Sequence, residues 1–271
     1  MSYTVAVVGA FGRLGSVVVK VVEALDDAKL VAALTSADSI EAALRADVVV
    51  DATTPVASPA IVEYLVSNGK RVLVGTSGWS ADRVAHLRGL VAAHPGSGVV
   101  VIPNFSLGSV LGSAFAAIGA RYFDSAEIIE SHHAGKVDSP SGTAVRTAEL
   151  MGAQRRDLGP VASPFADQRA RGQQVSSIPI HSLRMTGVVA RQEVVFGGPG
   201  ETLRITHDTV SPASYEAGIR ASIERTARAH DEVIIGLDAV LGVDVALGLA
   251  PAQGEPEEGT APLSGAAADD A

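Results

Sequence analysis

The first hundred residues alternate short apolar runs with helix-like stretches, and this alternation constrains the fold more than any other feature. The apolar runs are Thr4–Val8, Leu30–Leu34, Asp47–Val50, Arg71–Val74 and Gly98–Ile102, and the helix-like stretches are Arg13–Leu25, Ser39–Leu44, Ser58–Asn68 and Ser80–Ala93. Runs such as VAVV and VVV are apolar throughout, as the strands of a parallel sheet buried on both faces must be. The alternation predicts an α/β fold with a doubly wound, Rossmann-like N-terminal domain.

Beyond residue 103 the pattern changes. We expect a helix over Val110–Ala120, a strand over Ser125–Glu130, a helix over Ser141–Met151 that opens on a serine cap, and a polar loop over residues 152–176. Three alternating strands follow, and a glycine-rich turn joins the last two into a hairpin: Ile178–Met185, Val188–Phe196 and Thr202–Thr209. This pattern predicts a half-exposed antiparallel sheet packed against helices, in an inserted α+β domain.

The C-terminal part is expected to return to the first domain through a helix over Tyr215–Ala229 and a last element over Asp231–Leu241. The predicted units are residues 1–104 plus 214–249 for dinucleotide binding, residues 105–213 for substrate binding and oligomerisation, and a disordered acidic tail over 250–271. Helices are expected to cover only one face of the inserted sheet. A second copy of the chain could cover the other face, so we expect a homo-oligomer.

Composition excludes several classes of function. The chain has 271 residues, with 21 Lys and Arg against 30 Asp and Glu, and this net charge of −9 argues against nucleic-acid or membrane binding through a basic face. Cysteine is absent, which excludes disulfides, thiolate nucleophiles and zinc sites built from thiolates. The most hydrophobic uncharged stretch, Ser97–Ala120, is interrupted by Pro103-Asn104, and MSYTVAVVGA does not resemble a signal peptide. We therefore expect a cytoplasmic protein.

A glycine-rich turn joins the first strand to the first helix: Gly9, Ala10, Phe11, Gly12, Arg13, Leu14 and Gly15. Glycines let the backbone approach a pyrophosphate, and the helix N-terminus offers that anion free N–H groups and partial positive charge. In its strand–turn–helix context the G-x-x-G-x-x-G spacing predicts a dinucleotide site. The second strand ends in Leu34-Thr35-Ser36, where no carboxylate would repel a 2′-phosphate and two hydroxyl groups could donate to it, which leans modestly toward NADPH. Asp38 could still be the acidic residue that binds the ribose of NADH, so the preference stays open.

Two further loops follow the third and fourth strands. Asp51–Pro55 and Gly75–Gly78 are rich in glycine and hydroxyl groups, which suits close approach of the backbone to a cofactor. Because α/β sheets bind ligands at the carboxyl ends of their strands, we expect both loops to border the cofactor site.

The densest polar cluster of the chain is ESHHAGKVDSPSGT, residues 130–143. His132 and His133 are adjacent, and adjacent side chains on an extended backbone point opposite ways, so the two need not share a role. Lys136 is either a charge clamp or a proton donor. Gly142 and Thr143 open a helix whose N-terminus suits a carboxylate or a phosphate. A metal site is not expected, because no third ligand stands at a recognisable spacing.

These motifs resemble those of the 4-hydroxy-tetrahydrodipicolinate reductase family, also called dihydrodipicolinate reductase, of the diaminopimelate route to lysine. The motifs that carry the resemblance are GAFGRLG at 9–15, GTSG at 75–78, PNFSLG at 103–108, ESHHAGKVDSPSGTA at 130–144 and QEVVFGGPGETLRITH at 192–207. The 130–144 block is the most specific of them.

The resemblance implies a homotetramer that uses NADH or NADPH to reduce 4-hydroxy-tetrahydrodipicolinate, a cyclic imine dicarboxylate, to tetrahydrodipicolinate. It implies that His132 is a proton donor or acceptor, that Lys136 is a second donor, and that His133, Gly142 and Thr143 contact the substrate carboxylates. On the nicotinamide side, the implied cofactor contacts are Gly75, Thr76, Ser77, Ile102, Pro103, Asn104 and Phe105.

The chain departs from the family pattern at Ala52 and Ser77 in the cofactor loops, at Arg191 in the hairpin and at residues 211–215 after it. The family commonly carries Phe at the position of Ala52, Thr at that of Ser77 and His at that of Arg191. Within 211–215 it commonly carries an Arg before an aromatic residue. These departures leave two alternatives: a diverged homologue that reduces a related cyclic imine acid, and a catalytically weak nucleotide-binding scaffold. The retained 130–144 block argues against the scaffold, which has no need for a proton donor beside an anion site.

Overall fold

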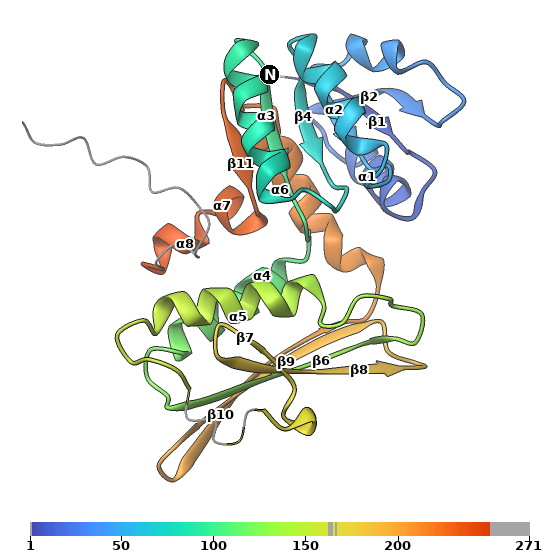
Figure 1. Ribbon diagram of the computed structural model, residues 1–271. Coiled ribbons are helices and arrows are strands. Elements are labelled where there is room, and N and C mark those ends of the chain that lie inside the picture. Colours follow the sequence, from blue (N-terminus) through green and yellow to red (C-terminus); the bar gives the residue numbers. More distant parts are fainter. Residues whose placement is uncertain (1, 162–164, 166, 250–271) are drawn as a thin grey trace, which may run out of the picture.

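The computed structural model describes residues 2–161, 165 and 167–249, whose strands form two sheets (Figure 1). The first sheet has the strand order β11-β5-β4-β3-β1-β2, and all its pairings are parallel. Its strands are β1 Tyr3–Val8, β2 Ala28–Leu34, β3 Val48–Asp51, β4 Arg71–Val74, β5 Gly98–Val101 and β11 Val233–Ile235. The expected Rossmann-like α/β class is confirmed, and β11 shows that the chain returns to the first sheet beside β5.

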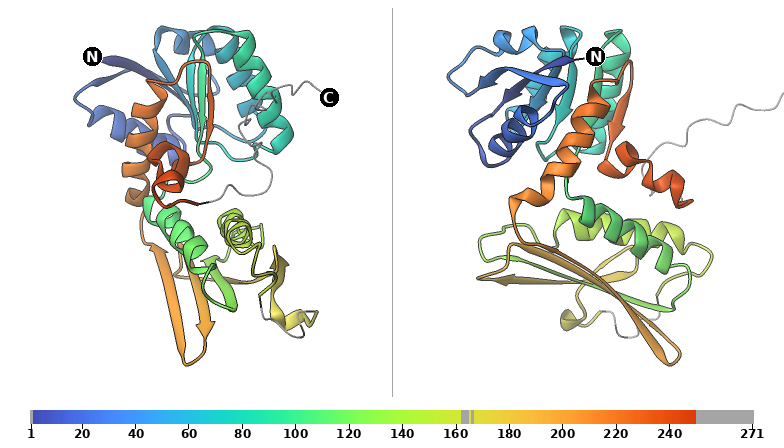
Figure 2. Two further views of the ribbon diagram at one scale, coloured as in Figure 1. Left: turned by 90° about the vertical axis from the view of Figure 1, so that its left-hand side faces the viewer. Right: turned by 180° about the vertical axis from the view of Figure 1, so that it is seen from behind.

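Alternate residues of these strands face two separate cores, which is why the strands are apolar throughout. Val5 and Val7 of β1 belong to the core on one face, whereas Ala6 and Val8 belong to the core on the other. Helices cover both faces, as the views in Figure 2 show. Those of the first face are α1 Arg13–Glu23 and α6 Glu216–Thr226, and those of the second are the 3₁₀ helix η1 Ile40–Arg45, α2 Ser58–Ser67 and α3 Ala81–Ala93. The stretch at Ser39–Leu44 was expected as an ordinary helix and is the six-residue 3₁₀ helix η1, which is capped by Ser39.

The second sheet has the order β10-β9-β6-β8-β7. Its strands are β6 Ser125–His133, β7 Gln173–Val175, β8 Ile178–Met185, β9 Ala190–Gly198 and β10 Glu201–Thr209. Helices α4 (Leu107–Gly119) and α5 (Gly142–Gln154) lie on the face turned toward the first sheet (Figure 1). Ile128 and Phe196 of the sheet share a core there with Ala116 of α4 and Met151 of α5.

Two expectations about this sheet are wrong. The sheet is mixed, because β6 pairs parallel with β8 while β6–β9 and β9–β10 are antiparallel. A parallel pair needs a long crossover, and the segment through α5 supplies it. Residues 152–176 are also not all loop: they hold the end of α5, the 3₁₀ helix η2 (Arg169–Arg171) and the edge strand β7.

Two connections join the sheets. Residues 102–106 lead from β5 into α4, and the 3₁₀ helix η3 (Pro212–Tyr215) leads from β10 into α6. The short helices α7 (Leu237–Leu241) and α8 (Val243–Ala246) follow β11 and contact α4. The domain boundaries at 104/105 and 213/214 stay a prediction, and the acidic tail lies outside the described residues. Among the helices described, none is long and apolar enough to cross a membrane.

Candidate active site

The glycine-rich turn lies at the carboxyl edge of β1, where its geometry suits a pyrophosphate. Gly9 has a φ of +81°, and a Cβ there would lie 2.5 Å from the carbonyl oxygen of Ala52. Gly12 is the N-cap of α1, and no side chain caps this helix. The N–H groups of its first turn therefore remain available to an anion, and Phe11 and Arg13 beside them are exposed. These residues fit a bound dinucleotide.

The loops after β4 and β5 reach the same edge and contact the turn. A Cβ on Gly75 would lie 2.7 Å from Cδ2 of Leu14 and 3.0 Å from Cε2 of Phe105, so these three predicted cofactor residues lie together. Thr76, Ile102 and Phe105 are buried and shape the loops, whereas Ser77 and Pro103 are exposed.

The end of β2 differs from the expectation. The chain turns back after Thr35, so that the backbone N–H and the hydroxyl of Thr35 both donate to Oδ2 of Asp38, at 2.8 and 2.7 Å. These two hydrogen bonds hold the pKa of Asp38 below its ordinary value, so this exposed carboxylate is charged at neutral pH. A carboxylate therefore does stand at this strand end, and Asp38 stays the alternative candidate for binding the ribose of NADH.

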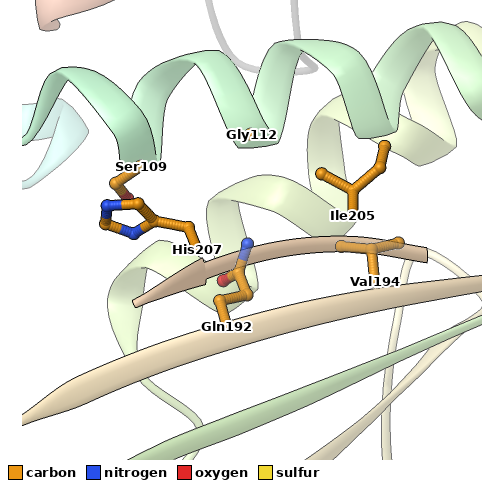
Figure 3. Close-up of a pocket in the computed structure, with 6 residues that line it drawn as sticks. All are labelled: Ser109, Gly112, Gln192, Val194, Ile205 and His207. Atoms are coloured by element: carbon orange, nitrogen blue, oxygen red, sulfur yellow. The ribbon is translucent and has the colours of Figure 1, made fainter. Parts of the chain in front are cut away.

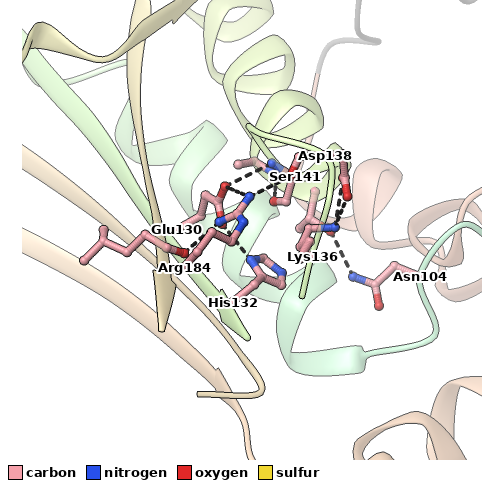
Figure 4. Close-up of polar contacts among 10 residues, drawn as sticks. Asn104, Glu130, His132, Lys136, Asp138, Ser141 and Arg184 are labelled. Atoms are coloured by element: carbon pink, nitrogen blue, oxygen red, sulfur yellow. Dashed lines mark hydrogen bonds and ion pairs between the residues drawn. The ribbon is translucent and has the colours of Figure 1, made fainter. Parts of the chain in front are cut away.

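At the end of β6, a fully buried carboxylate organises the 130–144 block (Figure 4). Oε1 of Glu130 accepts from the backbone N–H of Ser141 at 3.1 Å and from Arg184 at 3.0 Å. Oε2 accepts from Arg184 at 2.9 Å and contacts Nδ1 of His132 at 2.6 Å. His133, the next residue, is exposed. His132 therefore belongs to the cluster around Glu130, and His133 does not, which leaves different roles open to the two histidines.

Lys136 and Thr143 lie on the segment between β6 and the first turn of α5. Nζ of Lys136 donates to both oxygens of Asp138, at 2.7 and 2.8 Å. The hydroxyl of Ser141 caps α5 by accepting from Ala144, and the N–H groups of Gly142 and Thr143 in its first turn have no partner among the described residues.

One contact joins the predicted cofactor side to the predicted substrate side. Nδ2 of Asn104 donates to Oγ1 of Thr143 at 3.3 Å, and its Oδ1 accepts from the backbone of Ser106. Asn104 therefore links the loop after β5 to the start of α5, which lies against the other sheet. This contact brings the two halves of the predicted site together.

The electrostatics of the cluster follow from burial and pairing. Burial raises the pKa of Glu130, but hydrogen bonds from Arg184, Ser182 and His132 outweigh burial and hold this pKa below its ordinary value. Burial lowers the pKa of His132 despite the opposing influence of Glu130. At neutral pH the cluster thus holds an ionised Glu130 beside a mostly neutral His132.

Sequence reasoning assigned no role to Glu130, Arg184 or Asp138. Arg184 could have been found from the alternation of side chains between the two faces of a strand. Ile178, Ile180, Ser182 and Arg184 share one face of β8, and the first two are buried in the core. A charged residue at a core-facing position of a strand requires a buried partner.

Two cavities of the structure contain none of the predicted site residues. One lies between α4 and the β9–β10 hairpin, and Figure 3 shows its lining, Ser109, Gly112, Gln192, Val194, Ile205 and His207. The other lies between α2 and α3 beside Trp79. Cavity shape alone therefore does not identify the site. The described residues contain no group of three or more His, Asp or Glu that could hold a metal ion.

Comparison with known proteins gives consistent matches. A family model described as the N-terminus of dihydrodipicolinate reductase matches residues 3–105, and one for its C-terminus matches residues 108–241. The chain is 55% identical over 241 residues to the 4-hydroxy-tetrahydrodipicolinate reductase of Clavibacter sepedonicus, covering 89% of this chain and 87% of that protein. It is 46% identical to that of Thermobifida fusca, covering 88% and 98%. A solved structure, dipicolinate-bound dihydrodipicolinate reductase from Paenisporosarcina sp. TG-14, aligns with a TM-score of 0.74 at 31% identity, covering 88% of this chain and 99% of that one.

Proposed function

The chain belongs to the dihydrodipicolinate reductase family, and from this premise we propose roles for the residues of the site. Its activity is the NAD(P)H-dependent reduction of 4-hydroxy-tetrahydrodipicolinate in lysine biosynthesis. The Asn104–Thr143 contact is the observation that carries the assignment of roles, because it joins the cofactor loops to the segment that bears Lys136 and Thr143. Nothing on the described residues favours a diverged substrate or a scaffold.

NAD(P)H would lie along the turn at Gly9–Leu14 and the loops at Gly75–Ser77 and Ile102–Phe105, and it supplies a hydride to the substrate ring. The free N–H groups of Gly142 and Thr143, with the Thr143 hydroxyl, bind one substrate carboxylate. Exposed His133 lies at the end of the same strand as His132 and contacts the second.

Two proton transfers complete the reaction. Neutral His132, with Nδ1 toward Glu130, offers the lone pair of Nε2, so it accepts a ring proton and passes it to the hydroxyl group, which leaves as water. Hydride addition to one carbon of the resulting conjugated C=C bond places an electron pair on the other. Lys136 donates a proton to that carbon and recovers one from solvent. Its ammonium group has three N–H donors, and two of them bind Asp138, which leaves one for the substrate.

We expect Thr143→Val to raise KM for the dicarboxylate substrate about tenfold and to change kcat little. The substitution removes a hydroxyl that binds a carboxylate in both ground and transition state, and such a hydrogen bond contributes about 1.5 kcal/mol. Steady-state kinetics at saturating cofactor measures the effect. Thr143→Ser keeps the hydroxyl and serves as the control. A raised KM in both variants would show that the methyl group or the packing matters, rather than the hydroxyl.

We expect Asp38→Asn to raise kcat/KM for NADPH relative to NADH about tenfold, because it removes a negative charge that repels the 2′-phosphate. Asparagine keeps an oxygen that can accept from Thr35, so the turn after β2 is retained. The ratio of the two kcat/KM values is the measurement. Asp26→Asn, at the opposite end of β2, is the matched control and leaves the ratio unchanged. An unchanged ratio in Asp38→Asn would show that another residue binds the ribose.

We also propose a homotetramer formed through the face of the second sheet opposite α4 and α5. Apolar side chains lie on this face by parity, among them Ile129, Val195, Leu183 and Met185, and the last two are 38% and 47% exposed. Burial of such a face in an interface removes apolar surface from water, which stabilises association.

A further inference from the structure

The buried Glu130 carboxylate is surrounded by hydrogen-bond donors. Two hydrogen bonds come from Arg184, one from the backbone N–H of Ser141 and one from Nδ1 of His132, and the Ser182 side chain donates as well. An ionised carboxylate accepts hydrogen bonds and cannot donate them, so Nδ1 of His132 must carry a proton. The neutral imidazole then has its lone pair on Nε2, which has no partner among the described residues.

Arg184 ties the same carboxylate to the loop that bears Lys136. Its guanidinium group binds both oxygens of Glu130, and NH2 also donates to the backbone oxygen of Asp138 at 2.6 Å. The Glu130 side chain is fully buried, so without Arg184 it would hold an uncompensated charge. One ion pair therefore fixes three neighbours: the His132 ring, the Lys136–Asp138 segment and the start of α5.

We infer that Glu130 and Arg184 are positioning residues of the reductase: Glu130 holds His132 as the Nδ1–H tautomer, with Nε2 free for the substrate, and Arg184 keeps Glu130 ionised and joined to the Lys136 loop. The inference rests on the proposed role of His132. It adds two residues that do not touch the substrate and act through His132 and the loop.

The chain contains a built-in comparison for this arrangement. Glu127 lies three residues earlier on β6, on the opposite face, and also binds a histidine and an arginine, His181 and Arg171. Each carboxylate thus binds a His and an Arg, one of which lies on β8, but only Glu130 faces the predicted site. Any kinetic effect specific to Glu130 therefore reports position rather than the loss of a Glu–His–Arg contact in general.

The arrangement also determines how the rate depends on pH. The groups that face His132 are Glu130 on β6, Arg184 on β8 and Lys136 on the following loop. Burial, Lys136 and Arg184 lower the pKa of His132, and Glu130 raises it. Removal of the carboxylate charge should therefore lower this pKa further. Because neutral His132 is the working form, the acid limb of the kcat/KM profile should move to lower pH.

The first test compares Glu130→Gln with Glu127→Gln in the full chain. For Glu130→Gln we expect kcat to fall about 10–100-fold, as is usual when the partner that orients a functional histidine is lost. We also expect the acid limb to shift to lower pH. Glu127→Gln should retain kcat and the pH profile of the unmodified chain. Because Glu127 pairs with Val195 on the face proposed for the tetramer, gel filtration of this variant checks separately that its assembly is unchanged. A folded Glu130→Gln protein with unchanged kcat and unchanged acid limb overturns the inference.

The second test needs no variant at the carboxylate and decides the matter if Glu130→Gln does not fold. ¹⁵N NMR of histidine-labelled enzyme, with His132 assigned by the loss of its signal in His132→Gln, should show the proton on Nδ1. A proton on Nε2 overturns the inference. Full kcat in His132→Gln contradicts the proposed function instead, and the tautomer measurement remains a separate test of positioning.

A third variant tests the arginine. Arg184→Lys keeps the charge but cannot form the two-pronged contact with Glu130. We expect it to retain the tautomer of His132 and to lower kcat, because the link to the loop at Asp138 is lost. Full kcat in Arg184→Lys overturns the role assigned to Arg184.

Discussion

Lys136→Ala is expected to lower kcat by about 10²–10⁴-fold, the usual range for loss of a general acid. The ammonium group of Lys136 lies at the start of the segment proposed to bind the substrate. It is held by Asp138, which is itself kept ionised because the hydrogen bond from Lys136 lowers its pKa. Alanine removes both a proton donor and a positive charge near a dicarboxylate. The dissociation constant of NADPH, measured by fluorescence titration, should be unchanged, because the cofactor loops do not contact Lys136 in any hydrogen bond or ion pair described.

Lys136→Arg separates the two contributions of the lysine. Arginine keeps the positive charge but cannot be deprotonated in a protein, so it can bind a carboxylate without donating a proton. If Lys136 is the proton donor, Lys136→Arg retains KM and shows the same loss of kcat as Lys136→Ala. Recovery of kcat in Lys136→Arg would show that the residue acts as a charge clamp and that the proton comes from solvent or from His132.

Most of the fold could be predicted because burial on both faces leaves a plain signature in the sequence. Arg71–Val74 and Ile178–Met185 were placed as strands with the bounds that the structure has. Strand direction could not be predicted in the same way, since alternation within β8 tells which side chains are buried but not whether β8 runs parallel to β6. Direction depends on the crossover through α5, and polar residues after that helix concealed the edge strand β7.

The site was predictable where chemistry lies in one stretch of chain and not where it depends on distant residues. His132, Lys136 and Thr143 stand in one segment, and their types and spacing indicate a site for a carboxylate or a phosphate; the dicarboxylate comes from the family resemblance. Arg184 is more than fifty residues from Glu130, and only the register of β6 with β8 brings the two together. For a related reason, the sequence offered Asp38 only as an alternative at the end of β2. The turn after Thr35, which brings its carboxylate back to the strand end, is visible only in the structure.

Gly15→Ala is expected to disrupt the cofactor half of the protein although it adds only one methyl group. A Cβ on Gly15 would lie 2.0 Å from the carbonyl oxygen of Gly9 and 2.8 Å from its carbonyl carbon. Both are backbone atoms, so no side chain can swing aside, and α1 must move away from the turn. Overpacking of this kind costs about 1–3 kcal/mol or more in the free energy of unfolding. Displacement of α1 also moves the free N–H groups that are proposed to bind the pyrophosphate, so NAD(P)H affinity should fall with stability.

Gly89→Ala is the matched control, because Gly89 also lies inside a helix, α3, but a Cβ there would meet nothing within 4 Å. Alanine at this exposed position should stabilise the helix by about 1 kcal/mol through its higher helix propensity. The same chemical change is thus expected to raise the midpoint of thermal unfolding in α3 and to lower it in α1, by a few degrees in each direction. Thermal unfolding and NAD(P)H titration of both variants measure the two effects. A Gly15→Ala protein as stable as the unmodified chain, with unchanged cofactor affinity, would mean that α1 can shift without cost and that its close approach to the turn does not build the cofactor site.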